Sequence, residues 1–212
     1  MPADSLFNPS DMPGNTIRAR RPPFDAITMA LHWATAMLVL LMFASAALHG
    51  YAQTRQSDDT PTLLWMHRSL GTIVWITTAL RLAWRVSGAK LPPFPETMTP
   101  LHRLAVKSSE YALYSLLLSQ PVTGLLISLF NGHPFPLLFF DVSPLERDVP
   151  IRDAFHAVHA YGARALGLLA LGHAAAALFH HFVLRDDVLS CMAPVVAQAP
   201  PPRATQGVST PP

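Results

Sequence analysis

Residues 154–184 of the chain read AFHAVHAYGARALGLLALGHAAAALFHHFVL, and this stretch decides the fold. Arg164 is its one formally charged residue, and small Gly and Ala residues separate its larger apolar side chains. At about 1.5 Å per residue, a helix of this length exceeds the roughly 30 Å hydrocarbon core of a bilayer. The stretch therefore predicts a helix that crosses a membrane.

Three further apolar blocks precede it, at residues 27–48, 63–84 and 105–130. Hydrophobic residues make up 50% of the chain and charged residues 13%, well under the roughly 25% charged residues of soluble domains. The block at 63–84 is the weakest of the four, because Arg68 and Arg81 intrude near its ends, where an arginine can snorkel. The sequence thus predicts an all-α fold, an integral membrane four-helix bundle over residues 27–186.

The two ends of the chain differ from this apolar middle. Residues 1–26 and 187–212 are two tails rich in proline and polar residues. We expect the first to be disordered, the second to be disordered after Pro194, and neither to have a chemical role. Most Lys and Arg residues, Arg85 and Lys107 among them, fall on the side that carries both tails, whereas few, such as Arg55 and Arg147, fall on the other. Because positive charge collects on the cytoplasmic side, we expect both termini to be cytoplasmic.

Charge and cysteine content exclude several classes of protein. The net charge is +2, but the basic residues are scattered between apolar blocks and form no stripe, which argues against nucleic acid as a partner. Cys191 is the only cysteine. A lone cysteine excludes a disulfide within the chain, a cysteine-ligated iron–sulfur cluster and a covalent C-x-x-C-H haem attachment.

Histidines are the informative residues, because an ionisable side chain inside a bilayer is costly and needs a reason. His159 and His173 lie fourteen residues apart, which on a helix is nearly the same face, about 21 Å further on. His156 is turned away from that face. The direction of the helices then pairs His32 with His173 at the cytoplasmic level and His67 with His159 at the outer level.

Each of these four histidines has a small residue one turn later, which leaves room beside a ligand for a flat macrocycle but also suits ordinary helix packing. These small residues are Ala36, Gly71, Ala163 and Ala177. A single membrane histidine is more often a hydrogen-bonding residue than a ligand. For the set of four, a haem-free metal transporter and a proton relay stay open as alternatives, but two bis-histidine haems explain the paired depths better.

The chain resembles the bacterial di-haem cytochrome b561 family, which includes the cytochrome b subunits of nickel hydrogenases. The similar segments are ALHW at 30–33, MHRSLG at 66–71, QPVTGL at 120–125 and GHAAAALFHHFVLRDDVLSCMAP at 172–194. The resemblance implies two non-covalent b-type haems whose irons are held by His32, His67, His159 and His173. It also implies a multi-pass protein of the bacterial inner membrane.

Within that family, the chain is similar to the compact stand-alone members, among them the superoxide oxidases. This similarity implies an oxidoreductase that passes electrons from a periplasmic donor, such as superoxide, to the ubiquinone pool. The alternative is a non-catalytic di-haem anchor subunit that docks a dehydrogenase or hydrogenase as its redox partner protein. The apolar block at 105–130 has Lys107 and Glu110 where relatives often have histidines, and the roles of these two residues and of Arg164 stay open.

Two further residues are candidates for contacts at the sites. Arg68, with Arg147 and Arg152, could form a cationic mouth at the outer level for an anion or for haem propionates, although acidic residues in the same loop dilute this charge. His180 follows His173 by seven residues on nearly the same face and could hydrogen-bond a quinone that arrives from the lipid. The simpler alternative for the arginines is a mixed, solvated rim that also anchors haem propionates, and for His180 it is an interfacial polar residue at the end of the helix.

Overall fold

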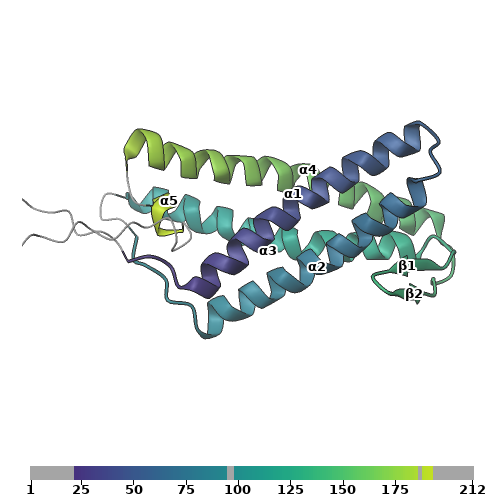
Figure 1. Cartoon of the computed structure of the whole chain (residues 1–212), viewed down its shortest axis with the longest axis horizontal. Coiled ribbons are helices and arrows are strands. Elements are labelled where there is room, and N and C mark those ends of the chain that lie inside the picture. The colour runs from purple at the N-terminus through teal and green to yellow at the C-terminus, as the bar shows by residue number, and fades with distance from the viewer. Residues whose placement is uncertain (1–21, 95–97, 186–187, 193–212) are drawn as a thin grey trace, which may run out of the picture.

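The computed structural model describes residues 22–94, 98–185 and 188–192, and four long helices dominate this part of the chain (Figure 1). They are α1 (Ala26–Thr54), α2 (Thr60–Ser87), α3 (Pro100–Leu129) and α4 (Val149–Phe179). α4 continues as a π-helical turn, η2 (His180–Leu184), and a short helix α5 (Val188–Cys191) follows. Of the two expected tails, residues 22–26 and 188–192 are described, and the latter include α5.

Polar residues at the start of the helices explain where they begin. The Asp25 carboxylate accepts hydrogen bonds from the Thr28 backbone at 2.9 Å and from the Thr28 hydroxyl at 2.7 Å. It also accepts bonds from Trp84 Nε1 at 3.0 Å and Lys90 N at 3.2 Å, so the cap ties the start of α1 to the end of α2. Thr99 caps α3 in the ordinary way, through the backbone of His102.

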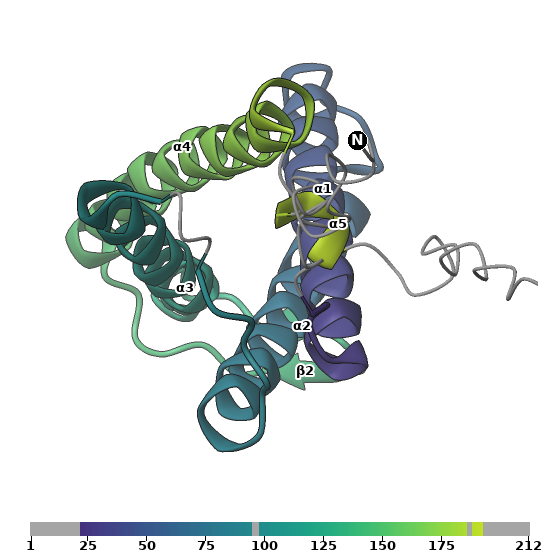
Figure 2. The same ribbon diagram turned by 90° about the vertical axis from the view of Figure 1, so that its left-hand side faces the viewer.

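The helices associate as two neighbouring pairs. α1 packs along α2 and α3 packs along α4, while α2 also contacts α3. The end-on view in Figure 2 shows the four helices around a common axis. A small apolar core joins α2, α3 and α4 through Val74, Leu117 and Leu166.

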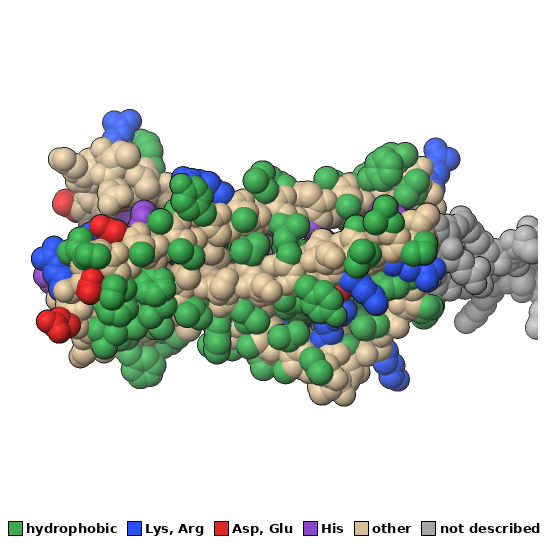
Figure 3. All heavy atoms as spheres, turned by 180° about the vertical axis from the view of Figure 1, so that it is seen from behind, with side chains coloured by type: hydrophobic (Ala, Val, Ile, Leu, Met, Phe, Trp, Pro, Cys, Tyr) green, Lys and Arg blue, Asp and Glu red, His purple; other side chains and the backbone are tan. Residues whose placement is uncertain are grey.

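Large apolar side chains cover much of the outside instead. Leu40 is 65% exposed, Leu168 73% and Leu171 70%, and Figure 3 shows hydrophobic side chains spread along the length of one face. Such a surface is costly in water and favourable in lipid. The packing therefore agrees with a membrane protein.

Among the described residues, three helical segments are long and apolar enough to cross a membrane, namely Ala26–Thr54, Pro100–Leu129 and Val149–Leu184. The helix α2 was predicted as the fourth span but is not among them. Its three arginines, Arg68, Arg81 and Arg85, and several hydroxyl side chains lower its hydropathy. The length of α2 is therefore as predicted, whereas its apolar character falls short of the prediction.

The connection between α3 and α4 holds a feature that the sequence did not predict. Two short antiparallel strands, β1 (Phe135–Leu137) and β2 (Phe140–Val142), form a hairpin there. Trp65 Nε1 donates to the carbonyl of Leu138 at 3.1 Å, and the Leu138 backbone donates to Ser69 Oγ at 3.1 Å. The hairpin is thus fixed to the first half of α2, beside His67.

Candidate functional site

The four predicted histidines meet as two pairs, and α4 contributes one residue to each. His32 on α1 faces His173 on α4, with ring centroids 6.3 Å apart and an angle of 55° between the rings. His67 on α2 faces His159 on α4, with the same centroid separation of 6.3 Å and an angle of 84°. These partners are the ones predicted from the direction of the helices.

His156 lies elsewhere. Its side chain is exposed, whereas His159, one turn later on α4, is half-buried opposite His67. The helical face that was used to choose between the two residues therefore describes their positions correctly.

The equal spacing of the pairs suits one transition-metal ion between each pair of rings. An imidazole nitrogen binds such an ion at about 2.0 Å, and the ring centre lies about 1.1 Å behind that nitrogen. Two rings that bind from opposite sides would then have centroids roughly 6.2 Å apart. Two protein ligands suit an iron whose remaining ligands come from a macrocycle, so the donor set and its spacing fit haem.

Hydroxyl and carbonyl oxygens fix the second pair, His67 and His159. Ser45 Oγ donates its one proton to the Met42 carbonyl at 2.8 Å, so at 3.1 Å from His67 Nδ1 it can only accept. Ser45 therefore holds the proton of His67 on Nδ1 and leaves Nε2 as the free lone pair. Acceptors of this kind orient a metal-binding histidine and raise its basicity.

His159 is held in the same way from α3. Thr123 Oγ1 donates to the Gln120 carbonyl at 2.8 Å and lies 2.9 Å from His159 Nδ1. The Gln120 carbonyl itself is 3.1 Å from the same nitrogen. Both contacts require a proton on Nδ1, so Nε2 of His159 is again the free lone pair.

The segment 120–125, QPVTGL, is therefore the support of His159. A Cβ atom added at Gly124 would stand 3.2 Å from His159 Cε1, so a side chain there would crowd the ring. Gly162 on α4 leaves room for the amide of Gln120 in the same way. Sequence reasoning used this segment only for its family resemblance and missed its contacts, although Thr and Gly one residue apart were the available signal.

The first pair has a different partner. Arg81 Nη2 lies 2.9 Å from His32 Nδ1. A guanidinium can only donate, so this ring accepts at Nδ1. Arg81 also lies over the ring of the buried Tyr114, with its Cζ atom 5.3 Å from the ring centroid. In the sequence, Arg81 only weakened the prediction that residues 63–84 span the membrane, whereas in the structure it contacts His32, a predicted ligand.

Glu110, whose role was left open, belongs to the surroundings of Arg81. It forms an ion pair with Arg85, one turn further along α2, at 2.8 Å. Lys107 lies near the start of α3, and its Nζ is 5.9 Å from the ring centroid of Phe94, which precedes that helix. Arg164 is exposed over Tyr161, at 5.3 Å from the ring centroid, and is not in contact with His159 in the structure.

Arg68 follows His67 directly, and its Cζ atom lies 4.9 Å from the ring centroid of Phe135 in the hairpin. Its Nε atom is buried and has no hydrogen-bond partner among the described residues. A buried, unsatisfied donor beside a predicted haem ligand suits a carboxylate such as a haem propionate.

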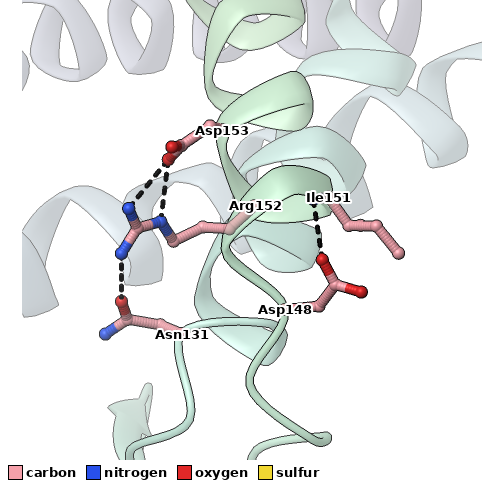
Figure 4. A network of polar contacts seen from close by, with 5 residues as sticks. All are labelled: Asn131, Asp148, Ile151, Arg152 and Asp153. Carbon is pink, nitrogen blue, oxygen red and sulfur yellow. Dashed lines mark hydrogen bonds and ion pairs between the residues drawn. The ribbon is translucent and has the colours of Figure 1, made fainter.

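The other two arginines of the expected cationic mouth differ from Arg68. Arg152 is bound to Asp153 at 2.8 Å and lies 3.4 Å from Asn131 Oδ1, next to the Asp148 cap of α4 (Figure 4). The backbone at Gly132 lies close to the Arg147 side chain. Arg152 is thus engaged in a local network, and Arg68 is the better candidate for an anion.

His180 was expected to be open to lipid, and this part of the expectation is wrong. Its side chain is only 6% exposed, and its Nε2 lies 3.3 Å from Nε2 of His102 on α3. The regular part of α4 ends at Phe179, and the π-helical turn η2 begins at His180. His102, which sequence reasoning did not consider, is thus its neighbour, whereas His181 is exposed.

Comparison with known proteins finds a family profile and relatives whose descriptions agree with one another. The family profile described as "Prokaryotic cytochrome b561" matches residues 23–194. The chain is 32% identical to "Cytochrome b561 homolog 2" of Escherichia coli (strain K12) over 176 residues, which cover 80% of this chain and 90% of that protein. It is 29% identical to "Cytochrome b561 homolog 1" of the same organism, with 81% and 97% covered. It is 25% identical to the "Probable superoxide oxidase CybB" of Yersinia pestis, with 81% and 96% covered.

Proposed function

Because the chain belongs to the prokaryotic cytochrome b561 family of membrane electron-transfer proteins with b-type haem, we propose that it carries electrons across the membrane between two haems b. His32 and His173 would hold one haem iron, and His67 and His159 the other. Bound haem supplies an iron that reversibly accepts one electron. The chain would supply the ligands, their orientation and an apolar surrounding that sets the distance and the reduction potentials.

The observation that carries this proposal is the equal spacing of the two histidine pairs. Both pairs have ring centroids 6.3 Å apart, although one joins α4 to α1 and the other joins α4 to α2. His159 and His173 lie fourteen residues apart on α4, which separates the two pairs by about 21 Å along the helix. This arrangement supports two haems at two depths rather than one.

The proposal includes α2 as a fourth span and both termini on the cytoplasmic side. α2 packs along α1, and contacts join them at both levels, between Asp25 and Trp84 at one and between Ser45 and His67 at the other. These contacts along the length of a candidate membrane span support the proposal that α2 crosses the membrane beside α1. The distribution of Lys and Arg supports the bacterial inner membrane with the His32 and His173 pair on the cytoplasmic side.

For the donor and the acceptor, we propose superoxide in the periplasm and ubiquinone in the bilayer. The similarity to the probable superoxide oxidase of Yersinia pestis motivates the donor, and the unsatisfied Nε of Arg68 beside His67 supports binding of an anion. On the other side, His180 and His102 are the candidate contacts of the quinone. A quinone would have to reach the pair between α3 and η2, because His180 is buried.

The haem content tests the central proposal. The purified full-length protein, reduced and examined by optical spectroscopy with a pyridine haem assay, should show two haems b per chain. A protein with one haem or none would overturn it. Superoxide added in the presence of ubiquinone should then reduce the haems faster than in a control with superoxide dismutase, and an equal rate would reject superoxide as the donor.

A second function, as a di-haem anchor subunit for a dehydrogenase, is favoured by the hairpin between α3 and α4. Phe139 at its tip is 93% exposed and Phe140 is 72% exposed, which is unusual for aromatic residues outside the lipid. Co-purification of a dehydrogenase from the native membrane, lost on Phe139→Ser substitution, would support this function over the stand-alone one.

A further inference from the structure

The two histidine pairs differ in what contacts their ring nitrogens. Arg68 follows His67 in the chain, but its guanidinium lies over the Phe135 ring, 4.9 Å from the centroid, and its Nε has no hydrogen-bond partner among the described residues. At the pair of His67 and His159, neutral oxygens of Ser45, Thr123 and Gln120 accept from the ring nitrogens. At the pair of His32 and His173, the cationic Arg81 lies 2.9 Å from His32 Nδ1. Nothing in the proposed function uses this difference.

Arg81 is held in place by groups that leave its charge uncompensated. Tyr114, only 8% exposed, carries the guanidinium over its ring. Glu110 is the nearby carboxylate, but its Oε2 is bound to Arg85 at 2.8 Å. Among the described residues no carboxylate pairs with Arg81, and a guanidinium stays charged at any relevant pH.

A fixed positive charge stabilises the state of a nearby metal that carries less positive charge, which is the reduced state. Screening is weak in an apolar interior, so the effect is larger there than in water. Acceptors on a ligating imidazole act in the opposite direction, because they raise its basicity and stabilise the oxidised state. The two kinds of partner therefore shift the reduction potentials of the two metal sites in opposite directions.

Metal binding at Nε2 of His32 would put the ring proton on Nδ1, and Arg81 could then no longer donate to that nitrogen. Its donors would turn to another acceptor, and a haem propionate is of the kind that a guanidinium binds best. The charge stays beside the pair in both arrangements. A propionate that is paired with Arg81 disfavours reduction of the haem iron less than an unpaired propionate does.

We propose that Arg81 makes the reduction potential of the haem at His32 and His173 higher than that of the haem at His67 and His159. This inference rests on the proposed function, in which both pairs hold haem. With both haems bound, one electron would pass from the haem at the second pair to the haem at the first, so that one iron would be oxidised and the other reduced, with no bond broken and no proton transferred. Arg81 is a positioning residue that gives the transfer its direction, from the outer side to the cytoplasmic side.

A redox titration of the purified holoprotein, followed in the haem spectrum, tests the role of Arg81. Arg81→Gln should lower the higher midpoint potential by at least about 59 mV, which corresponds to a tenfold change in the equilibrium constant for transfer of one electron. Arg81→Lys should restore most of the difference, because it keeps the charge. Arg164→Gln is the matched control, since Arg164 lies over Tyr161 at the same 5.3 Å but contacts no predicted ligand, and it should change neither midpoint.

Ser45→Ala provides an independent test from the other pair. It removes the acceptor from His67 and should raise the lower midpoint, so that the two values approach each other. This variant decides the matter if Arg81→Gln fails to assemble. Unchanged midpoints in Arg81→Gln and Ser45→Ala, or an equal shift of both haems, would overturn the inference. A wild-type protein without two haems would instead contradict the proposed function.

Discussion

The pair of His67 and His159 and the pair of His32 and His173 look alike in spacing and differ in what surrounds them. Both have ring centroids 6.3 Å apart. The first is enclosed by acceptors from two helices, whereas the second faces a guanidinium. The spacing indicates what the two pairs have in common, and the surroundings indicate how they differ. Identical ligands can therefore serve unequal sites.

The largest expected effect concerns the identity of the ligands. His159→Ala should remove one of the two haems, because His67 then lacks its partner across the site. His156→Ala is the matched control one turn away, and its exposed side chain should be dispensable. A pyridine haem assay on both purified variants gives the ratio. Loss of haem in the His156 variant alone would mean that the two pairs are not built as described.

The next largest effect concerns the glycines that lie beside the two histidine pairs. Gly124→Ala brings a Cβ atom to 3.2 Å from His159 and should cost about 1–3 kcal/mol as an overpacked contact. The variant should lose haem from the pair of His67 and His159 first. Gly172→Ala, next to His173, meets nothing within 4 Å and should retain both haems. Equal haem contents in the two variants would show that the QPVTGL segment does not support His159.

A smaller effect concerns the helix caps at the two ends of the bundle. Asp25→Ala removes a cap and also the bonds to Trp84 and Lys90, so it should destabilise the protein by more than the cap value of about 1 kcal/mol. Asp148→Ala loses only the cap of α4, through Ile151, and should cost about that value. Thermal unfolding in detergent compares the two. Equal shifts would mean that the bonds between α1 and α2 contribute nothing.

The same residue gives a pH dependence. Burial alone would raise the pKa of Asp25, but hydrogen bonds from Thr28 and Trp84 lower it from 3.8 to about 2. A carboxylate with a depressed pKa contributes its stability above its unfolded value, near pH 4, and loses it as the pH falls toward 2. The difference in thermal stability between the wild type and Asp25→Ala should therefore shrink across that window. A constant difference from pH 5 to pH 2 would contradict this account.

The smallest effect is expected at the ion pair between Arg85 and Glu110. Their side chains are 32% and 26% exposed, so Glu110→Gln should cost about 0–1 kcal/mol. Both haems should remain bound. If the variant raises the higher midpoint, the carboxylate acts on the electron-transfer site and is not merely a partner of Arg85, because the loss of a nearby negative charge favours the reduced state.

The membrane character and the histidine pairing could be predicted from sequence because both follow from simple periodicities. Hydropathy over about 20 residues predicts a span, and the rise and turn of a helix fix which of two histidines shares a face. The same reasoning failed for His180, where the regular helix ends, and for the hairpin at Phe135–Val142, which forms in a connection without such a periodicity.

The sequence by itself determined the helices, the family and the partners within each histidine pair, since these depend on local geometry and on the direction of each helix. Only the tertiary structure decided what faces each ring. Ser45 precedes His67 by twenty-two residues and Arg81 follows His32 by forty-nine, so their contacts arise from the packing of α1 against α2. Long side chains such as arginine reach their partners across helices, and the packing alone selects which partner that is.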